Sequence, residues 1–308
     1  MSIEVKDLTK IYGEQKAIDT ISFTVNKTEI VGFLGPNGAG KSTTMKIITG
    51  YLQQNSGNAL VCGINVKEQP LEVKRKIGYL PEANPLYYDM YIKEYLDFVA
   101  NIHHIINKKQ RIEEIIRIVG LLPEGKKKIS QLSKGYKQRV GLAASLIHDP
   151  EVLILDEPTT GLDPNQIVEI REVIKNLGRN KTVLFSSHIL QEVEAICDRV
   201  IIINKGKLVA DNKLSQLRQQ QKNNIIQVAF RETIDPDLLK ALRKVISINR
   251  TDDWHWELES EDVTEVKKQL LELALQNNLN IVSLQNEKGT LEDIFRSLTS
   301  EQNHDLHD

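Results

Sequence analysis

An octet near the N-terminus has the residue types and spacing of a loop that binds phosphate groups. Glycines at fixed offsets let several backbone N–H groups point at one anion. We expect the Lys41 ammonium to contact the β- and γ-phosphates and the Ser42 hydroxyl to help hold Mg²⁺. The sequence therefore predicts a site for a nucleoside triphosphate, formed by Gly35, Pro36, Asn37, Gly38, Ala39, Gly40, Lys41, Ser42 and Thr43.

Two adjacent carboxylates form the second group of residues that could do chemistry. Asp156 and Glu157 directly follow an apolar run at 152–155 that is typical of a buried parallel strand. Ligands of α/β sheets collect at the carboxyl ends of such strands, so Asp156 is a candidate to share Mg²⁺ with Ser42. Glu157 can act as general base or position the water that attacks the γ-phosphate. A merely solvated pair at a strand end is the alternative interpretation.

The elements that must position these groups follow from hydrophobic periodicity. Short apolar runs predict buried strands at 28–34, 152–155, 182–185 and 200–203. Helical spacing predicts helices at 42–49, 166–177 and 189–196. Alternation of strands with helices favours a parallel sheet. Alternating residues at 3–5 and 21–25 predict an antiparallel edge layer, and helical patterns between 84 and 122 predict a helical insertion.

Length and composition limit the possible classes of protein. The 308 residues are enough for two domains, and the 40 basic and 42 acidic side chains give no bias towards nucleic acid or anionic lipid. Two cysteines, Cys62 and Cys197, are too few for a disulfide framework or a metal cluster, which suits a reducing cytosol. The sequence has no signal peptide and no run of 18 uncharged apolar residues, so we expect a soluble, cytoplasmic chain.

A polar stretch at 218–224 marks the expected boundary between two domains. Beyond it, strand and helix patterns follow the order β-α-β-β-α-β, with helical spacing at 238–245 and 263–273. Thr290 and Asp293 resemble a capping box that opens a last helix. The expected ranges are 1–217 for the first domain, about 84–148 for its helical subdomain, 223–300 for the C-terminal domain and 301–308 for a disordered tail.

Three further segments make a family resemblance specific. Residues 132–136, Leu-Ser-Lys-Gly-Tyr, resemble the Leu-Ser-Gly-Gly-Gln signature of the nucleotide-binding subunits of ATP-binding cassette (ABC) transporters. The segment at 161–164 resembles the loop that follows the catalytic acid in that family, and His188 resembles its switch histidine. The resemblance covers about residues 1–215 and implies an ATPase whose ligands are ATP and Mg²⁺.

The resemblance also implies roles for single residues. His188 would hydrogen-bond the γ-phosphate and act in catalysis with Glu157 and Lys41. Tyr12 would offer an aromatic face to the adenine, although a tyrosine at a strand end is often ordinary packing. Glu82 stands where the family has a loop glutamine. Its carboxylate oxygens can coordinate Mg²⁺ at the nucleotide site, but a carboxylate cannot donate the hydrogen bond that an amide donates.

A second copy of the chain completes the implied site. Ser133 and Gly135 would head a helix that contacts the γ-phosphate bound by the other copy, and Asp163 lies in the loop that would approach the same nucleotide. A homodimer would then clamp two nucleotides. Two positions depart from the family pattern, because Lys134 replaces glycine and Tyr136 replaces glutamine. The Lys134 side chain either adds charge near the nucleotide or points to solvent.

The fold class expected from these observations is α/β: a P-loop NTPase cassette with a mixed sheet core, an antiparallel edge layer and a helical insertion, plus a small C-terminal α+β domain of ferredoxin-like order. The implied protein is the energising subunit of an exporter, bound at the inner face of the cell membrane through a separate integral-membrane permease. The tyrosines at 85–91 have two equally good interpretations, an interface with the permease and ordinary packing within the chain. Among exporter-type relatives, those of gliding motility look closest.

Two other functions fit the sequence less well than transport. A cassette ATPase that acts on ribosomes or DNA is disfavoured by the single cassette and by the lack of a basic bias, and the acidic residues around Trp254 and Trp256 repel nucleic acid. We therefore expect no nucleic-acid partner. A P-loop kinase or GTPase switch would have no use for Ser133 and Gly135.

Overall fold

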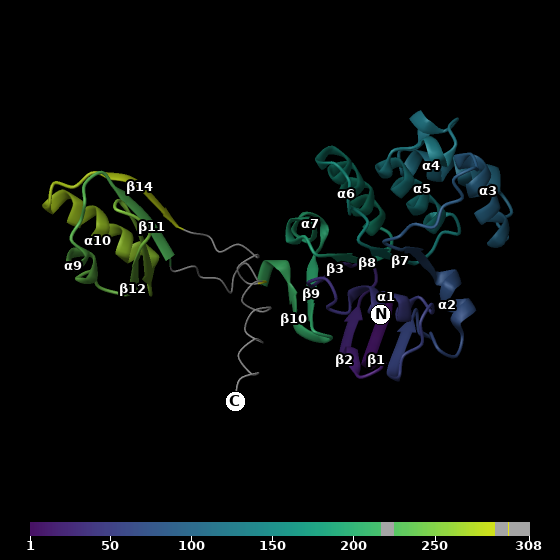
Figure 1. Ribbon diagram of the computed structural model, residues 1–308, viewed down its shortest axis with the longest axis horizontal. Coiled ribbons are helices and arrows are strands. Elements are labelled where there is room, and N and C mark those ends of the chain that lie inside the picture. Colours follow the sequence, from purple (N-terminus) through teal and green to yellow (C-terminus); the bar gives the residue numbers. More distant parts are fainter. Residues whose placement is uncertain (217–224, 287–294, 296–308) are drawn as a thin grey trace. The chain divides into compact units, whose positions relative to one another are not determined.

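The described residues of the computed structural model are 1–216, 225–286 and 295. They fall into two compact units (Figure 1), of which the first contains Met1–Ser215 and the second begins at Gln216. Apart from residue 295, the helix expected after Thr290 lies outside the described residues, and so does the tail at 301–308. These two expectations stay predictions.

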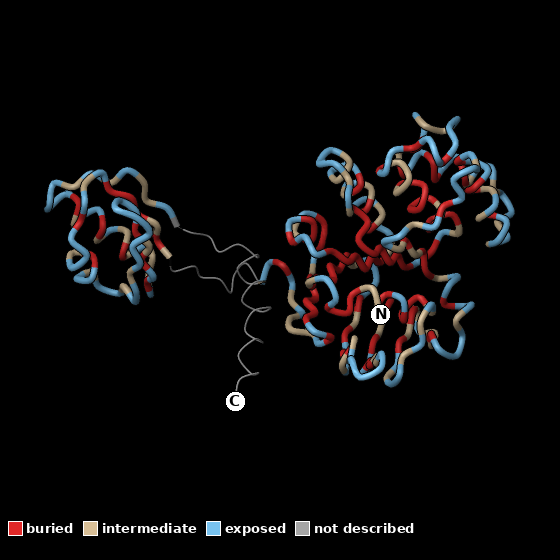
Figure 2. Tube along the Cα trace, in the orientation of Figure 1, coloured by how far each residue is buried: buried red, intermediate tan, exposed pale blue. Residues whose placement is uncertain are grey.

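A six-stranded mixed sheet forms the centre of the first unit, in the order β10-β9-β3-β8-β7-β6. Its strands are β3 (Ile30–Leu34), β6 (Ile77–Leu80), β7 (Val152–Asp156), β8 (Thr182–Ser187), β9 (Arg199–Asn204) and β10 (Lys207–Lys213). All neighbours are parallel except β10 and β9. Every residue of β3, β7 and β8 is buried, and Figure 2 shows this run in red. The predicted buried parallel strands are therefore confirmed.

An antiparallel layer with the order β2-β1-β4-β5 lies beside this sheet. Its strands are β1 (Ile3–Tyr12), β2 (Gln15–Val25), β4 (Ser56–Val61) and β5 (Ile64–Asn65). Ile3 lies opposite Val25 and Val5 lies opposite Phe23, as the alternation of apolar residues predicts. The rings of Phe23 and Phe33 are 5.4 Å apart between centroids, so the two layers share one apolar core.

Helices cover both faces of the central sheet. They are α1 (Lys41–Ile48), α2 (Pro70–Lys76), α6 (Pro164–Gly178) and α7 (Leu190–Ile196). Met45 of α1 packs in the core that contains Phe33 of β3. On the other face, α7 approaches so closely that a Cβ on Gly32 would collide with Val193. Helix–strand contact on both sides explains why the strands between them contain uninterrupted apolar runs.

A helical insertion separates β6 from β7. It contains α3 (Ile92–Ile102), α4 (Lys108–Ile118), α5 (Lys134–Leu146) and the short 3₁₀ helices at Leu122–Glu124 and Ile129–Gln131. Gly120, with a φ of 72°, follows the end of α4, as expected for a helix stop. The helical insertion predicted between 84 and 122 is confirmed. Its apolar positions Ile112, Ile115 and Ile116 are buried, whereas Ile102 is exposed.

The second unit has the predicted β-α-β-β-α-β order. Its elements are β11 (Ile225–Phe230), α9 (Pro236–Lys240), β12 (Val245–Arg250), β13 (His255–Ser260), α10 (Val263–Gln276) and β14 (Ile281–Asn286). The sheet order is β12-β13-β11-β14, and all neighbours are antiparallel. The expected helix at 238–245 is wrong at its end, because Val245 pairs with Ser260 and so joins the sheet ladder.

Candidate nucleotide-binding and catalytic site

Four parallel strands end at the same level of the central sheet. Leu34 at the end of β3 lies opposite Ser187 at the end of β8, and Asp156 at the end of β7 lies opposite Ser186. The next pair along the sheet, β7 and β6, is also in register, with Leu155 opposite Leu80. This register brings the segments that follow the four strands to one edge, where they can form a common site.

The phosphate-binding loop connects β3 to α1 and has a backbone that favours glycine. Gly38 and Gly40 have φ angles of 80° and 110°, which side-chain-bearing residues rarely adopt. A Cβ on Gly40 would also collide with the Ala17 carbonyl oxygen. Because α1 begins at Lys41, the first N–H groups of this helix have no acceptor within the helix and are available to an anion.

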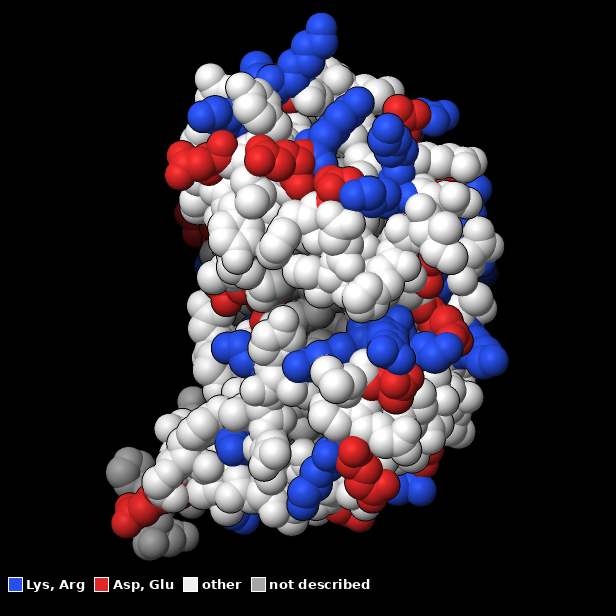
Figure 3. All heavy atoms as spheres, turned by 90° about the vertical axis from the view of Figure 1, so that its right-hand side faces the viewer, with Lys and Arg blue, Asp and Glu red and all other residues white. Residues whose placement is uncertain are grey.

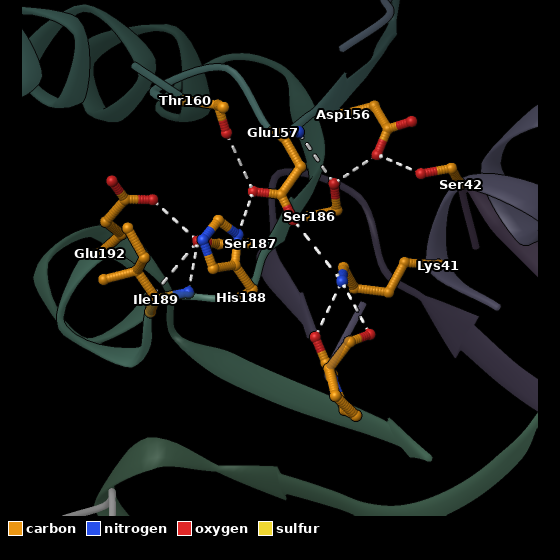
Figure 4. A network of polar contacts seen from close by, with 12 residues as sticks. Lys41, Ser42, Asp156, Glu157, Thr160, Ser186, Ser187, His188, Ile189 and Glu192 are labelled. Carbon is orange, nitrogen blue, oxygen red and sulfur yellow. Dashed lines mark hydrogen bonds and ion pairs between the residues drawn. The ribbon is translucent and has the colours of Figure 1, made fainter. Parts of the chain in front are cut away.

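The Lys41 ammonium lies at the centre of the loop and is nearly buried. It donates hydrogen bonds to the carbonyl oxygens of Gly35 at 2.8 Å and Pro36 at 3.2 Å. Its Nζ is 3.5 Å from Oε1 of Glu157, so lysine and acid form a buried ion pair (Figure 4). A polyphosphate that enters the loop would compete with the Glu157 carboxylate for this cation.

Asp156 and Ser42 supply oxygen atoms that meet at the strand end. The Ser42 hydroxyl donates to Oδ1 of Asp156 at 3.1 Å, and the Ser186 hydroxyl donates to the same oxygen at 2.6 Å. Within the described residues, no cluster of three or more His, Cys, Asp or Glu side chains could hold a metal ion by itself. A hydroxyl and one carboxylate fit Mg²⁺ that takes its remaining ligands from phosphates and water.

Glu157 has a backbone conformation that is rare outside glycine, with a φ of 50°, and its side chain is buried. Its Oε2 receives a hydrogen bond from Thr160 Oγ1 at 3.2 Å and lies 2.7 Å from Nδ1 of His188. The Ser186 hydroxyl accepts the Glu157 backbone N–H at 2.9 Å. Such strain persists where the surroundings fix the residue, and it is common at functional sites.

A cavity of about 520 Å³ opens between these groups. It is lined by Ala17, Asn37, Gly38, Gly40, Lys41, Ser42, Thr43, Glu82, Glu157, Thr160 and His188. The structure thus brings together the phosphate loop, the second acid of the pair, the histidine and the loop acid, although they come from four separate parts of the sequence. A triphosphate in this cavity would have a cation, a carboxylate and an imidazole within reach.

Eight of the predicted residues do not line this cavity. Gly35, Pro36, Ala39 and Asp156 lie one or two positions from lining residues in the chain, whereas Tyr12, Ser133, Gly135 and Asp163 belong to other segments. Tyr12 is half exposed, and its ring lies 5.2 Å from the Lys10 ammonium. The Ser133 hydroxyl caps α5 by accepting the Tyr136 N–H at 3.4 Å. The Asp163 carboxylate caps α6, and Gly135 lies against the Gln166 side chain, which leaves no room for a Cβ.

Lys134 extends along the protein surface towards the loop that follows the acid pair. Although the residue is exposed, a Cβ on Gly161 would collide with its Nζ. The ammonium therefore lies over Gly161, whose φ of 71° also favours glycine. In this way the segment at 132–136 contacts the loop after Asp156 and Glu157 within one chain.

The hydroxyl groups that orient the two acids were not predicted from the sequence. Ser186 contacts both Asp156 and the Glu157 backbone, and Thr160 contacts the Glu157 carboxylate. Ser187 was not predicted either, and it ends β8 beside Ser186. The available signal was two small polar residues at the end of an apolar strand, directly before the histidine.

Comparisons with known proteins identify the class of this protein. Residues 18–160 match the sequence model of the ABC transporter family, and residues 213–299 match that of the C-terminal domain of DrrA1-3-like ATP-binding proteins. The chain is 36% identical over 305 residues to the bacitracin transport ATP-binding protein BcrA of Bacillus licheniformis, with 96% of each chain covered. It is 34% identical over 305 residues to the linearmycin resistance ATP-binding protein LnrL of Bacillus subtilis (strain 168), with 96% of this chain and 98% of the relative covered.

A solved structure agrees with this class. The dimeric structure of MJ0796, a bacterial ABC transporter cassette, is similar with a TM-score of 0.64 and 25% identity, covering 69% of this chain and 98% of that chain. The chain therefore belongs to the ABC transporter family. It is a DrrA-like ATP-binding subunit of an exporter, which hydrolyses ATP for transport.

These findings confirm the predicted fold class, family, ATPase activity and exporter class. ATPases of this family dimerise and pair with a permease. In the part of the chain that the structure describes, no helix has the length and apolar character needed to cross a membrane.

Proposed function

We propose that this chain binds Mg-ATP in the cavity at the sheet edge and hydrolyses it as a homodimer. The observation that carries this proposal is the contact of the buried Glu157 carboxylate with both Lys41 and His188, at 3.5 Å and 2.7 Å, beside the Ser42 and Asp156 oxygens. One carboxylate between a cation and an imidazole can accept a proton from an attacking water while the cation holds the phosphate.

The groups at the edge would divide the reaction between them. Lys41 would hold the β- and γ-phosphate oxygens, and the Glu157 carboxylate, released from that cation, would take the proton of the attacking water. His188 would donate a hydrogen bond to the γ-phosphate. Ser42 and Asp156, with Glu82 on the cavity wall, would hold Mg²⁺, which supplies charge neutralisation for the phosphates.

The site would be completed by a second copy of the chain. Ser133 caps α5 at its N-terminus, and neither it nor Gly135 or Asp163 lines the cavity of its own chain. Ser133 and Asp163 are exposed and would contact the nucleotide of a partner, with Gly135 in the first turn of α5 and Lys134 adding a cation beside them. The similar MJ0796 cassette is dimeric in its solved structure, which supports this arrangement. Tyr12 would stack on the adenine from the exposed end of β1.

A separate permease would dock in a groove on the first unit, and this contact would transmit the movement of the dimer to the permease. The groove has a volume of about 740 Å³ and is lined by residues of α2 and α3, including Lys74, Arg75 and Tyr95. Figure 3 looks onto this side of the molecule and shows a hollow with basic side chains on its lower edge. We propose that a permease segment with acidic and apolar residues docks there, and that this contact holds the protein at the inner face of the membrane. Tyr87, exposed near the groove, suits such an interface.

The names of BcrA and LnrL refer to bacitracin transport and linearmycin resistance. We propose that the exporter served by this chain likewise carries an antibiotic-type compound. Neither name refers to gliding motility, so the resemblance to that group stays a prediction. Both names refer to transport or resistance, and neither refers to work on ribosomes or DNA, which was the alternative function.

The test of this proposal is Glu157→Gln in the full chain. Removal of the base should lower ATP turnover about 100-fold or more while ATP still binds, and size-exclusion chromatography should then show an ATP-dependent dimer. A matched control is Glu151→Gln, at the opposite end of the same strand, where the carboxylate contacts Lys76 at 2.6 Å. Unchanged turnover in Glu157→Gln, or a monomer at every concentration with ATP, would contradict the proposal.

A further inference from the structure

A buried carboxylate that takes no part in the proposed reaction connects the two loops that do. Glu192 lies in the first turn of α7 and is 1% exposed. Its Oε2 accepts hydrogen bonds from Thr159 Oγ1 at 2.6 Å and from Ser187 Oγ at 2.8 Å. Thr159 stands two residues after Glu157, and Ser187 stands directly before His188. We name this set of contacts the Glu192 bridge.

The histidine side of the bridge also fixes the main chain. The Ser187 hydroxyl donates to Glu192 and accepts the backbone N–H of Ile189 at 2.9 Å. The Ser187 hydroxyl therefore contacts both Glu192 and the residue that follows His188, as Figure 4 shows. Thr159 and Ser187 are buried, so solvent does not compete for these hydrogen bonds.

The bridge runs parallel to a second link between the same loops. That link is the contact of His188 Nδ1 with Glu157 Oε2, on the cavity wall, and the imidazole is 41% exposed. In the proposed reaction the Glu157 carboxylate binds the attacking water and His188 binds the γ-phosphate. Their mutual contact therefore cannot hold the loops in place throughout the reaction. The buried contacts involve no reacting atom and can stay intact.

We propose that Glu192 is a positioning residue that keeps the loop after Glu157 and the loop of His188 at a fixed spacing while those side chains exchange partners. The inference rests on the proposed function, since it assumes that Glu157 and His188 act on ATP. Loss of the bridge lets the base and the histidine separate, which lowers kcat, and leaves the phosphate loop and hence KM for ATP unchanged.

The experiment compares Glu192→Gln with Glu192→Leu in the full chain. Glutamine keeps an oxygen in the place of Oε2, so it can accept both hydroxyls, whereas leucine keeps the size and accepts none. We expect Glu192→Leu to lower kcat about 10-fold or more with KM changed less than about 2-fold, and Glu192→Gln to keep kcat within about 3-fold of the unaltered chain. Equal losses for both variants, or a normal kcat for Glu192→Leu, would overturn the proposal.

Two single-hydroxyl variants keep the test valid if Glu192→Leu does not fold. Thr159→Val and Ser187→Ala each remove one contact of the bridge, and their effects on kcat should be non-additive in the double variant, because either change alone disconnects the loops. Strictly additive effects would count against a shared role. Ser2→Ala is the matched control, since it removes a buried hydroxyl contact, to Thr182 at 2.8 Å, at the other end of β8.

The same measurements separate this inference from the proposed function. If the unaltered chain hydrolyses ATP and Glu157→Gln does not, the proposed function stands, and the Glu192 variants decide the bridge by themselves. If the unaltered chain hydrolyses no ATP, the proposed function fails first. Thermal unfolding of each variant provides a further readout. A merely structural role would lower the melting temperatures of Glu192→Gln and Glu192→Leu without a selective change in kcat.

Discussion

The central sheet of the first unit and the sheet of the second unit distribute their polar side chains differently. In the six-stranded sheet, polar groups gather at the ends of buried strands, such as Asp156 and Ser187. In the four-stranded sheet of the second unit they alternate along the strands and pair with their neighbours. Gln227 contacts Glu257 at 3.3 Å, and Ser247 contacts Glu259 at 2.9 Å.

Strand direction explains this difference. Parallel neighbours all end at one edge, so polar residues placed after each strand converge on one site. Antiparallel neighbours end at opposite edges, and a sheet packed on one face leaves polar residues spread over the other. Burial alternates accordingly in β13, where Trp256 and Leu258 are buried and His255 and Glu259 are exposed. A reaction centre is therefore expected in the first unit and packing in the second.

The largest effect should come from the charge at the centre of the parallel edge. Lys41→Ala removes the cation that two loop carbonyls and Glu157 hold, so we expect ATP turnover to fall about 100-fold or more. Lys244→Ala is the control in the second unit, where the ammonium contacts Asp262 at 3.1 Å and turnover should not change. Steady-state ATPase assays measure both variants. Comparable losses of turnover in Lys41→Ala and Lys244→Ala would contradict the view that only the first unit holds the reaction centre.

The core of the second unit should respond in stability and not in catalysis. Leu258 is fully buried, so Leu258→Ala should destabilise this unit by about 2–5 kcal/mol. Below the resulting unfolding transition, ATP turnover should equal that of the unaltered chain. Calorimetry together with ATPase assays measures both effects. Val282→Ala, at an exposed position, should change stability by less than about 0.5 kcal/mol. A matching fall in kcat for Leu258→Ala would show that the second unit supports catalysis.

A single hydroxyl should influence both acids of the parallel edge. Ser186→Ala leaves the Glu157 N–H and one Asp156 oxygen without this partner, which should cost about 1–3 kcal/mol of unfolding free energy and lower kcat. Chemical denaturation and ATPase assays test this. Ser145→Ala, which removes a buried hydroxyl contact within α5, should cost stability without lowering kcat. An unchanged kcat in Ser186→Ala would contradict the assigned role.

The smallest effect concerns pH. Burial lowers the pKa of His148 to about 4 from its usual 6.5. The unfolded chain therefore binds this proton at a higher pH than the folded one, so the free energy of unfolding should fall as pH drops from 6.5 to 4. In His148→Phe this loss should be smaller, so the stability difference from the unaltered chain should narrow at low pH. Equilibrium denaturation at pH 4 and at pH 6.5 measures this, and an equal loss in both chains would contradict the assigned effect of burial.

Sequence alone determined the parts of this protein that depend on short segments. The phosphate loop, the acid pair and the strands before them could be predicted because each is encoded within a few consecutive residues, by fixed glycine offsets or by an apolar run. The order of strands and helices after residue 224 was readable for the same reason. Local patterns failed at Val245, where pairing with Ser260 extends the strand at the expense of the expected helix.

Only the tertiary structure decided which side chains meet. Ser186, Ser187, Thr159 and Glu192 have ordinary neighbours in the sequence, yet they orient the acids and connect the loops. Their role depends on the parallel register of β7 and β8 and on the close packing of α7, which bring together residues about 30 positions apart. Hydrogen bonds of this kind depend on distance and direction in space, and neither quantity can be read from spacing along the chain.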